Sequence, residues 1–276
     1  MMSTEPDVVV VTGAGGMGLA VARRLGGGRT VLLADAFPDT LDRAVDALRA
    51  EGYTAKGQVT DVSDAPSVVK LAEAAAGAGR LTAVVHTAGV SAATSTVRKI
   101  MEVDLLGTAH VIDAFEQVAT RGTAVVCVAS MAGHVARLTE EQEQALATAP
   151  AAELLDLDVV RDARDGEPVM AYILAKRANH VRVQAAALAY NRRGARINTV
   201  SPGVIATPMA RAEQDSASGD HMLATLEACG IGRPGTPGEL AEVVAFLTGP
   251  GSLYLTGTDV LLDGGQAGWL RWHRPR

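Results

Sequence analysis

Short runs of continuous apolar residues alternate along this chain with longer segments in which apolar positions recur at helical spacing. The apolar runs predict strands at 8–11, 30–35, 81–86, 123–130, 195–201 and 258–265, and the periodic segments predict helices at 17–25, 39–50, 65–76, 95–119, 170–191 and 237–247. Strands without polar alternation are typical of parallel sheets covered on both faces. The pattern therefore predicts a doubly wound α/β fold with helices on both sides of one parallel sheet.

No Pro/Ser-rich linker, internal repeat or low-complexity block divides the sequence, so we expect a single domain spanning 1–276. One stretch, 131–171, breaks the alternation and is too long for a plain loop. It carries a helix signal of its own, because Thr139 and Gln142 have capping-box spacing. We predict an inserted helical lid or flap at about 137–168, with a solvent-facing decoration remote from the site as the alternative.

The composition narrows the classes of function. With 48% hydrophobic residues the chain can bury a large core, and its net charge of −6 argues against a general nucleic-acid or anionic-membrane surface. The N-terminal residues show no basic region followed by a long apolar run, so neither a signal peptide nor a membrane span is expected. Cys127 and Cys229 cannot form a disulfide framework and lack the neighbours of a zinc site. We expect a cytoplasmic protein without a metal.

A glycine-rich turn follows the first predicted strand. Gly13, Gly15 and Gly18 have G-x-G-x-x-G spacing and stand where the strand passes into a helix. Glycine there permits a tight turn and close approach of the backbone to a pyrophosphate at the helix N-terminus, as in Rossmann dinucleotide-binding folds. We expect the phosphates of a cofactor to lie against Gly13, Gly15, Gly16, Met17 and Gly18.

Asp35 ends the second predicted strand, 17 residues after Gly18. A carboxylate at that place can accept hydrogen bonds from both ribose hydroxyls of NAD, and it repels the 2′-phosphate of NADP. The next residues, Ala36 and Phe37, add no cation that would bind this phosphate. The sequence therefore predicts NAD as the cofactor, with a plain turn residue as the alternative reading of Asp35.

Tyr172 and Lys176 are four residues apart in the predicted helix 170–191, so their side chains share one face. Taken alone, the pair is typical of the edge of an amphipathic helix. A lysine ammonium beside a phenol stabilises the phenolate and lowers a pKa that is otherwise near ~10, too high for a base at neutral pH. The spacing thus permits an acid/base centre, and the rest of the chain decides between the two interpretations.

Six segments in order give the chain a resemblance to the short-chain dehydrogenase/reductase family over nearly its whole length. They are the glycine turn from Thr12, TDVSD at 60–64, HTAG at 86–89, Ser130 at a strand end, YILAK at 172–176 and INTVSPGVIATPM at 197–209, and LTGTDVLLDGG at 255–265 is similar to the family's last strand. Each segment is a weak signal alone, whereas the ordered set is specific. The resemblance implies an oxidoreductase that interconverts a secondary alcohol and a ketone by hydride transfer.

The resemblance also implies roles for individual residues. Tyr172 would be the general acid/base, Lys176 its electrostatic partner and a ligand of the nicotinamide ribose, and Ser130 would orient the substrate oxygen. Besides Tyr172 and Lys176, further cofactor contacts would come from Asp61, Val62, Ala88, Gly89, Pro202, Gly203, Val204 and Thr207.

Three positions depart from the family's pattern. The glycine turn is one residue shorter than the family's usual Gly-x-x-x-Gly-x-Gly, and His86-Thr87 replaces the common Asn-Asn, where we expect His86 to be a core-edge imidazole. Asp104 stands where the family commonly has an Asn that helps to hold a water in the proton relay. We expect Asp104 to act as the fourth catalytic residue and to favour protonated Lys176; a helix residue facing elsewhere is the alternative.

Other functions stay open on the sequence, namely an epimerase or dehydratase that reuses bound NAD, and a nucleotide-sensing regulator without turnover. We expect a largely apolar alcohol or ketone as the substrate. The residues expected to line its pocket are Met131, His134, Met209, Met222 and Leu223. The alternative is that these side chains only fill the core. By the resemblance we expect a homotetramer, or failing that a dimer, formed through the helices at 95–119 and 170–191 and the last strand.

Overall fold

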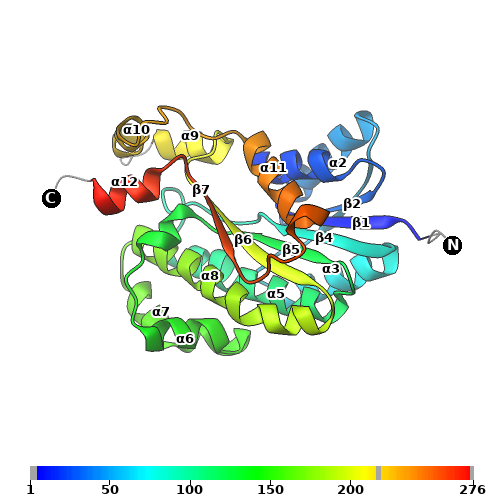
Figure 1. The fold of residues 1–276 in the computed structure, drawn as a ribbon, viewed down its shortest axis with the longest axis horizontal. Helices are drawn as coiled ribbons and strands as arrows, with labels where there is room; N and C mark the ends of the chain where they lie inside the picture. The colour runs from blue at the N-terminus through cyan, green and yellow to red at the C-terminus, as the bar shows by residue number, and fades with distance from the viewer. Residues whose placement is uncertain (1–4, 216–218, 274–276) are drawn as a thin grey trace.

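A parallel sheet of seven strands forms the centre of the computed structural model, which describes residues 5–215 and 219–273 (Figure 1). The strands are β1 (Asp7–Thr12), β2 (Thr30–Asp35), β3 (Thr54–Val59), β4 (Arg80–His86), β5 (Ala124–Val128), β6 (Arg196–Pro202) and β7 (Asp259–Leu262). Their order across the sheet is β3-β2-β1-β4-β5-β6-β7, and all neighbours are parallel. The order reverses between β1 and β4, which is where doubly wound folds open a crevice for ligands.

Helices cover both faces of the sheet, as the apolar strands predict. One layer consists of α1 (Gly16–Leu25), α2 (Pro38–Ala50) and α11 (Pro237–Thr248), and the other of α3 (Ala65–Ala78), α5 (Thr108–Val118) and α8 (Pro168–Arg192). Along β1, Val9 and Val11 face the first layer while Val8 and Val10 face the second, and all four are fully buried. The predicted doubly wound fold is confirmed.

The sequence pattern does not predict β3, which forms one edge of the sheet and pairs only with β2. This strand contains Lys56 and Gly57, and Ala55 is its only buried residue. An edge strand that is half solvated needs no apolar run, and a charged residue on it discourages pairing with another chain. A rule based on continuous apolar runs therefore misses it.

The predicted helix at 95–119 is divided into three parts. α4 (Val97–Ile100) passes into a π-helical segment, η1 (Met101–Gly107), before α5 begins. A π-turn takes one more residue per hydrogen bond than an α-turn and is frequent at functional sites. Asp104 lies at the middle of η1, and its side chain is completely buried.

The long segment before α8 folds into η2 (Met131–Val135), α6 (Glu140–Thr148), η3 (Ala151–Asp156) and α7 (Asp158–Arg164). The capping box of Thr139 and Gln142 is present at the start of α6. Leu146, Leu154 and Val160 of the insertion are fully buried in an apolar cluster that they share with α8 and η1. The insertion is thus an integral layer that covers α8.

In Figure 1, α6 and α7 lie along the side of α8 that faces away from the sheet. The guanidinium of Arg182, on α8, donates to the carbonyls of Leu146 and Ala149 at 3.0 and 2.9 Å and so holds the end of α6. No residue of 137–168 lines either of the two site cavities described below. A function of the insertion as a lid stays a prediction.

The remaining elements are α9 (Pro208–Gln214), α10 (Gly219–Ala228), η4 (Pro250–Ser252) and α12 (Gln266–Trp272). α9 follows the end of β6, and α10 contacts both α9 and α12 at that end of the molecule (Figure 1). Within the part of the chain that the structure describes, no helix has the length and apolar character needed to cross a membrane.

Candidate active site

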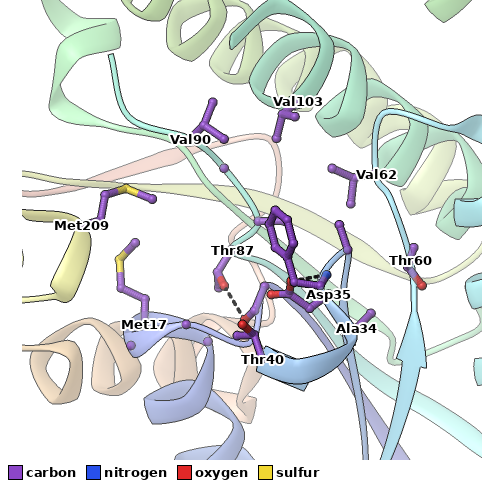
Figure 2. A pocket seen from close by; sticks show the side chains of 18 of the residues that line it. Met17, Ala34, Asp35, Thr40, Thr60, Val62, Thr87, Val90, Val103 and Met209 are labelled. Carbon is purple, nitrogen blue, oxygen red and sulfur yellow. Dashed lines mark hydrogen bonds between the residues drawn. The ribbon is translucent and has the colours of Figure 1, made fainter. Parts of the chain in front are cut away.

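A cavity of about 300 Å³ opens at the carboxyl ends of β1, β2, β3 and β4 (Figure 2). Four separate strand ends thus contribute to one wall. The lining includes these residues that the sequence assigns to a dinucleotide: Gly13, Gly15, Gly16, Met17, Gly18, Asp35, Asp61, Val62, Ala88, Gly89 and Thr207. The structure brings all of them to the same cavity.

The backbone of the first turn explains two of its glycines. Gly13 has a φ of 85°, and a Cβ there would stand 2.8 Å from the backbone nitrogen of Ala88. A Cβ on Gly18 would overlap the carbonyl of Gly13. Gly15 is the N-cap of α1, and a Cβ on it would meet no atom within 4 Å. The first N–H groups of α1, which have no acceptor within the helix, therefore border open space that suits an anion.

Asp35 fixes the rim of this cavity at the end of β2. Its Oδ2 accepts a hydrogen bond from the Ala14 N–H at 2.8 Å, and its Oδ1 accepts one from the Phe37 N–H at 2.9 Å. Each carboxylate oxygen has a further lone pair, so the group can still accept hydroxyl donors. Phe37 also lines the cavity, and its side chain is 69% exposed. The sequence analysis uses Phe37 only to note that no positive charge follows Asp35.

The far end of the cavity is formed by the segment after β3. Partial burial alone would raise the pKa of Asp61, but hydrogen bonds from the side chain and backbone of Ser63 outweigh it and lower the pKa. Thr60 and Lys99 also line this end and are absent from the sequence-based prediction. Lys99 belongs to no sequence motif, and it lines the cavity only because of where α4 lies. Its position could therefore not be predicted from the sequence.

A second cavity of about 90 Å³ adjoins the first and shares with it residues such as Met17, Thr87 and Thr207. Its lining contains the remaining predicted site residues except Asp104, which lines neither cavity: Ser130, Tyr172, Lys176, Pro202, Gly203 and Val204. Ser130 comes from the end of β5, Tyr172 and Lys176 from α8, and the others from the end of β6. The joined cavities therefore run from the glycine turn to the Tyr-x-x-x-Lys pair.

α8 presents Tyr172 and Lys176 on one face, with the Lys176 Nζ 5.1 Å from the centre of the Tyr172 ring. The Tyr172 side chain is only partly buried, whereas Lys176 is buried. Ser130 is the N-cap of η2, and its Oγ accepts a hydrogen bond from the Ala132 N–H at 3.1 Å. A serine that caps a turn has a fixed orientation, and its hydroxyl proton stays available to another acceptor.

Lys176 has a charged partner outside the cavities. Its Nζ lies 3.2 Å from the Asp104 Oδ1, which also accepts a hydrogen bond from the Val90 N–H at 3.1 Å. Burial disfavours the ammonium of Lys176, but the negative charges of Asp104 and Tyr172 raise its pKa above the ordinary value. Burial also raises the pKa of Asp104, since Lys176 and Val90 offset its desolvation only in part. Because the lysine starts from the higher pKa, the proton of the pair resides on Lys176.

His86 is fully enclosed behind the site, between two threonines. Thr108 Oγ1 donates to the Asp104 carbonyl at 2.8 Å, so the contact of 3.1 Å between it and the His86 Nε2 requires an N–H on that nitrogen. The His86 Nδ1 then accepts from the Thr12 Oγ1 at 2.7 Å. Burial, with the nearby charge of Lys176, lowers the pKa of His86 to about 3. His86 is a neutral imidazole of the core that does not line either cavity.

Among the described side chains that were predicted to line the substrate pocket, only one is found at the cavities. Met209 lines both cavities, whereas Met131, His134 and Leu223 line neither. The side chain of Met222 lies outside the described residues. His134 is instead hydrogen-bonded to Asp259, an arrangement that the sequence does not signal.

Comparison with known proteins shows the family to which this chain belongs. The family model described as short chain dehydrogenase matches residues 7–141, and the one described as enoyl-(acyl carrier protein) reductase matches residues 135–267. A short-chain dehydrogenase/reductase of Alternaria brassicicola, bsc3, is 38% identical over 274 residues, which cover 96% of this chain and 97% of the relative. Together with the parallel fold, these matches define an oxidoreductase that uses a nicotinamide cofactor. The chain belongs to the short-chain dehydrogenase/reductase family.

Two further similarities bear on chemistry. The cis-4-hydroxycyclohexanecarboxylate dehydrogenase of Sinomonas cyclohexanicum is 30% identical over 275 residues, covering 94% of this chain and 95% of that relative. Among solved structures, a point variant of actinorhodin polyketide ketoreductase with NADPH has a TM-score of 0.75 and 25% identity, with 97% of this chain and 99% of that chain covered. Family membership implies a nicotinamide cofactor and a small-molecule substrate. The glycine turn and Asp35 offer the geometry that such a cofactor needs.

Proposed function

We propose that this protein is an NAD-dependent oxidoreductase that interconverts a secondary alcohol and a ketone. The observation that carries the proposal is the convergence of Ser130, Tyr172 and Lys176 on one cavity that is joined to the cavity of the glycine turn. A hydroxyl donor, a phenol and an ammonium at one place are the groups that a carbonyl/alcohol conversion needs for orientation and proton transfer.

The glycine turn and Asp35 would hold NAD, which when bound would supply the hydride chemistry. The phenolate of Tyr172 takes the proton of the alcohol during oxidation, and the phenol gives a proton to the carbonyl oxygen during reduction. The ammonium of Lys176, 5.1 Å from the ring centre, stabilises the phenolate, and the hydroxyl of Ser130 holds the substrate oxygen. Asp104 acts through Lys176 by holding its proton, and its buried Oδ2, which has no partner among the described residues, is an acceptor for a relay water.

The preference for NAD over NADP rests on Asp35 in this proposal. The carboxylate is held at the cavity rim by the N–H groups of Ala14 and Phe37, and a 2′-phosphate beside it would meet a like charge. Lys99 also lines this cavity, but it belongs to α4, where its charge acts on Asp61, and not to the turn after Asp35. The ketoreductase of similar fold was solved with NADPH, so the preference has to be measured.

The substrate is proposed to be a largely apolar alcohol or ketone. Apolar side chains predominate on the wall of the second cavity, namely Met17, Val90, Val128, Val204, Ile205 and Met209. Ser130, Tyr172 and Lys176 can serve the reacting oxygen, but further polar or charged groups of a substrate would lose hydration against the apolar wall.

The test is turnover by the purified protein with NAD and a panel of secondary alcohols, followed through the absorbance of the reduced cofactor. Tyr172→Phe should lower kcat by about 100- to 10,000-fold and leave NAD binding intact. Tyr190→Phe is the matched control, because Tyr190 lies on the same helix but is buried and donates to the Ile112 carbonyl. Turnover that survives Tyr172→Phe would refute the proposed acid/base role.

Two alternatives have distinct outcomes in the same assay. Tightly bound NAD with no net change of the cofactor in the presence of any substrate would favour an epimerase or dehydratase. NAD binding without turnover of either kind would favour a regulator.

We also propose that the protein forms a homotetramer, or failing that a dimer. Light scattering that gives a monomer at micromolar concentration would contradict this proposal. The two free cysteines, Cys127 and Cys229, fit the proposed cytoplasmic location.

A further inference from the structure

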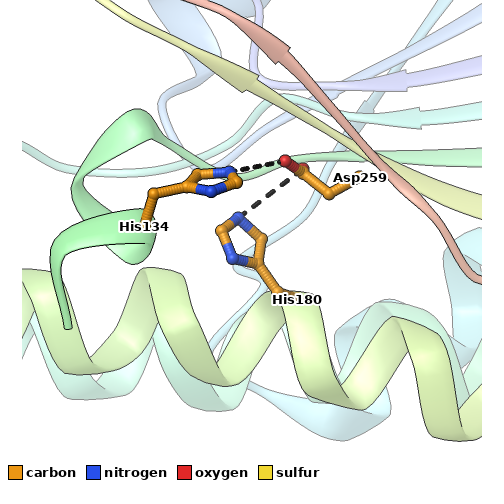
Figure 3. Close-up of side chains that lie close together, drawn as sticks. All are labelled: His134, His180 and Asp259. Carbon is orange, nitrogen blue, oxygen red and sulfur yellow. Dashed lines mark hydrogen bonds and ion pairs between the residues drawn. The ribbon is translucent and has the colours of Figure 1, made fainter. Parts of the chain in front are cut away.

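Behind the candidate active site, three side chains with metal-ligating atoms converge from distant parts of the chain (Figure 3). His134 comes from η2, His180 from α8 and Asp259 from β7, and one ligand atom of each lies within 4.8 Å of the others. Among the described residues no other group of three such side chains is found. The cluster is separate from the two cavities, whose linings contain none of these residues.

The Asp259 carboxylate is the centre of the cluster. Its Oδ2 accepts from the His134 Nε2 at 2.7 Å, and its Oδ1 accepts from the Thr199 and Ser201 hydroxyls at 2.6 and 2.7 Å. Since Ser201 gives its proton to Asp259, it accepts an N–H from the His180 Nε2 at 2.7 Å. The two hydroxyls therefore orient the carboxylate between the two imidazoles, as hydrogen-bond partners of metal ligands do.

We infer that His134, His180 and Asp259 form a binding site for a divalent transition-metal ion of the zinc class. Two imidazoles and one carboxylate are a ligand set for zinc and similar ions, whereas calcium and magnesium favour oxygen ligands. This site is an addition to what the sequence indicates, because the sequence points to no metal.

The distances suit such an ion. Around a tetrahedral zinc with bonds of 2.0 to 2.1 Å, neighbouring ligand atoms are about 3.3 Å apart. The separations here are 2.7 Å from the His134 Nε2 to the Asp259 Oδ2 and 3.6 Å from the His180 Nε2 to the Asp259 Oδ1. These values, which involve the two different oxygens of the carboxylate, lie on either side of the required spacing, and all three ligand atoms lie within 4.8 Å of one another. Side-chain shifts of about 1 Å would therefore accommodate the ion.

The exposed fractions of the three side chains differ, which gives an ion a route into the site. The His134 side chain is 32% exposed, while those of Asp259 and His180 are 11% and 1% exposed. An ion can therefore enter past His134 and meet two ligands that the protein already holds. Both histidines bind the ion as neutral imidazoles, so the proton of each Nε2 moves to Nδ1 as the metal replaces the hydrogen bonds to Asp259 and Ser201. The three protein ligands leave the fourth position of a tetrahedral ion to water on this open side.

The position of the site gives it a structural consequence. His134 follows Ser130 by four residues, and His180 follows Lys176 by four residues on α8. An ion would therefore join the turn that carries Ser130 to the helix that carries Lys176 and to β7. It would not contact the reacting atoms, so we expect it to raise stability and to fix the relative position of these elements.

The experiment uses the full-length, untagged protein after treatment with a chelator. Calorimetric titration with Zn²⁺ should give one ion per chain, Co²⁺ should produce the visible absorption of a four-coordinate site, and Zn²⁺ should raise the Tm. His134→Asn should weaken Zn²⁺ binding by more than about 100-fold, because losing even an outer partner of a ligand costs about 10- to 100-fold. Asp259→Asn should have a similar effect.

His273→Asn is the matched control, because it removes an exposed histidine at the end of α12 and should leave the affinity unchanged. The inference is overturned if the wild type binds no stoichiometric Zn²⁺, if His134→Asn binds as tightly as the wild type, or if His273→Asn causes an equal loss. None of these measurements involves NAD or an alcohol, so their outcome is independent of the proposed oxidoreductase activity.

Discussion

Gly89 and Asp104 are in such close approach that a Cβ on residue 89 would stand 2.7 Å from the Asp104 Oδ1. The same Cβ would be 3.5 Å from the Lys176 Nζ. Gly89 therefore lines both cavities and also leaves room for the buried ion pair of Lys176 and Asp104. Backbone and ion pair must fit together for Lys176 to reach the site.

Gly89→Ala should accordingly separate Lys176 from Asp104. We expect a loss of about 1 to 3 kcal/mol in the free energy of unfolding, as for other insertions of a methyl group into a packed interior, and a lower kcat for alcohol oxidation. Urea unfolding and steady-state kinetics measure the two effects. Gly27→Ala is the control, because a Cβ there meets no atom within 4 Å. Wild-type behaviour of Gly89→Ala would contradict the close packing.

Asp104→Asn should move both limbs of the pH–rate profile to lower pH. Without the carboxylate, less negative charge opposes the Tyr172 phenolate, so the acid limb of alcohol oxidation should fall by about one pH unit. The pKa of Lys176 should also fall, because burial disfavours its ammonium and the compensating charge is gone. Glu102→Gln removes a charge from the same π-helical segment, where Glu102 pairs with Arg98, and should leave the profile unchanged. A superimposable profile for Asp104→Asn would exclude Asp104 from the relay.

Asp35→Asn should weaken the discrimination between NAD and NADP. The amide keeps an oxygen for one backbone N–H but removes the charge that repels a 2′-phosphate. We expect the ratio of kcat/KM for NAD to that for NADP to fall by about tenfold, equivalent to about 1.4 kcal/mol. Asp39→Asn, which removes an exposed charge in the first turn of α2, should not change the ratio. A ratio that is also unchanged in Asp35→Asn would mean that another feature selects the cofactor.

His86 should contribute to the loss of stability in acid. Its pKa is lowered in the folded protein from 6.5 to about 3, so the unfolded chain binds the proton first and stability falls as the pH decreases from 6.5 toward 3. Between pH 7 and pH 4.5 this amounts to roughly 2 to 3 kcal/mol. In His86→Asn the decrease in unfolding free energy over this interval should be smaller by about that amount. Urea unfolding at both pH values measures it, and an equal decrease in wild type and variant would count against a neutral, buried His86.

The hydrophobic pattern was sufficient for most of the fold, because β1, β2 and β5 are buried on both faces and carry apolar runs. It failed where burial is one-sided, as in β3 with Lys56 and Gly57, and it could not reveal the π-helical segment, which has the composition of an ordinary helix. Asp104 could be placed at the site by family resemblance, but its direct contact with Lys176 depends on that segment.

The histidine–aspartate cluster was beyond sequence inference for another reason. His134, His180 and Asp259 stand in three elements that are far apart along the chain and form no spacing motif. His134 could only be assigned by proximity to Ser130, which suggested the substrate wall. The arrangement of β6 and β7 beside α8 instead brings it to Asp259.

The insertion also contributes to the position of α8, the helix that carries Tyr172 and Lys176. Leu146, Leu154 and Val160 cover one side of α8, and Arg182 fastens that helix to the end of α6. Tyr172 is therefore held partly by a segment that never enters the cavity. If Tyr172 has the acid/base role proposed above, substitutions that repack this layer against α8 should change kcat, although no residue of 137–168 lines either cavity.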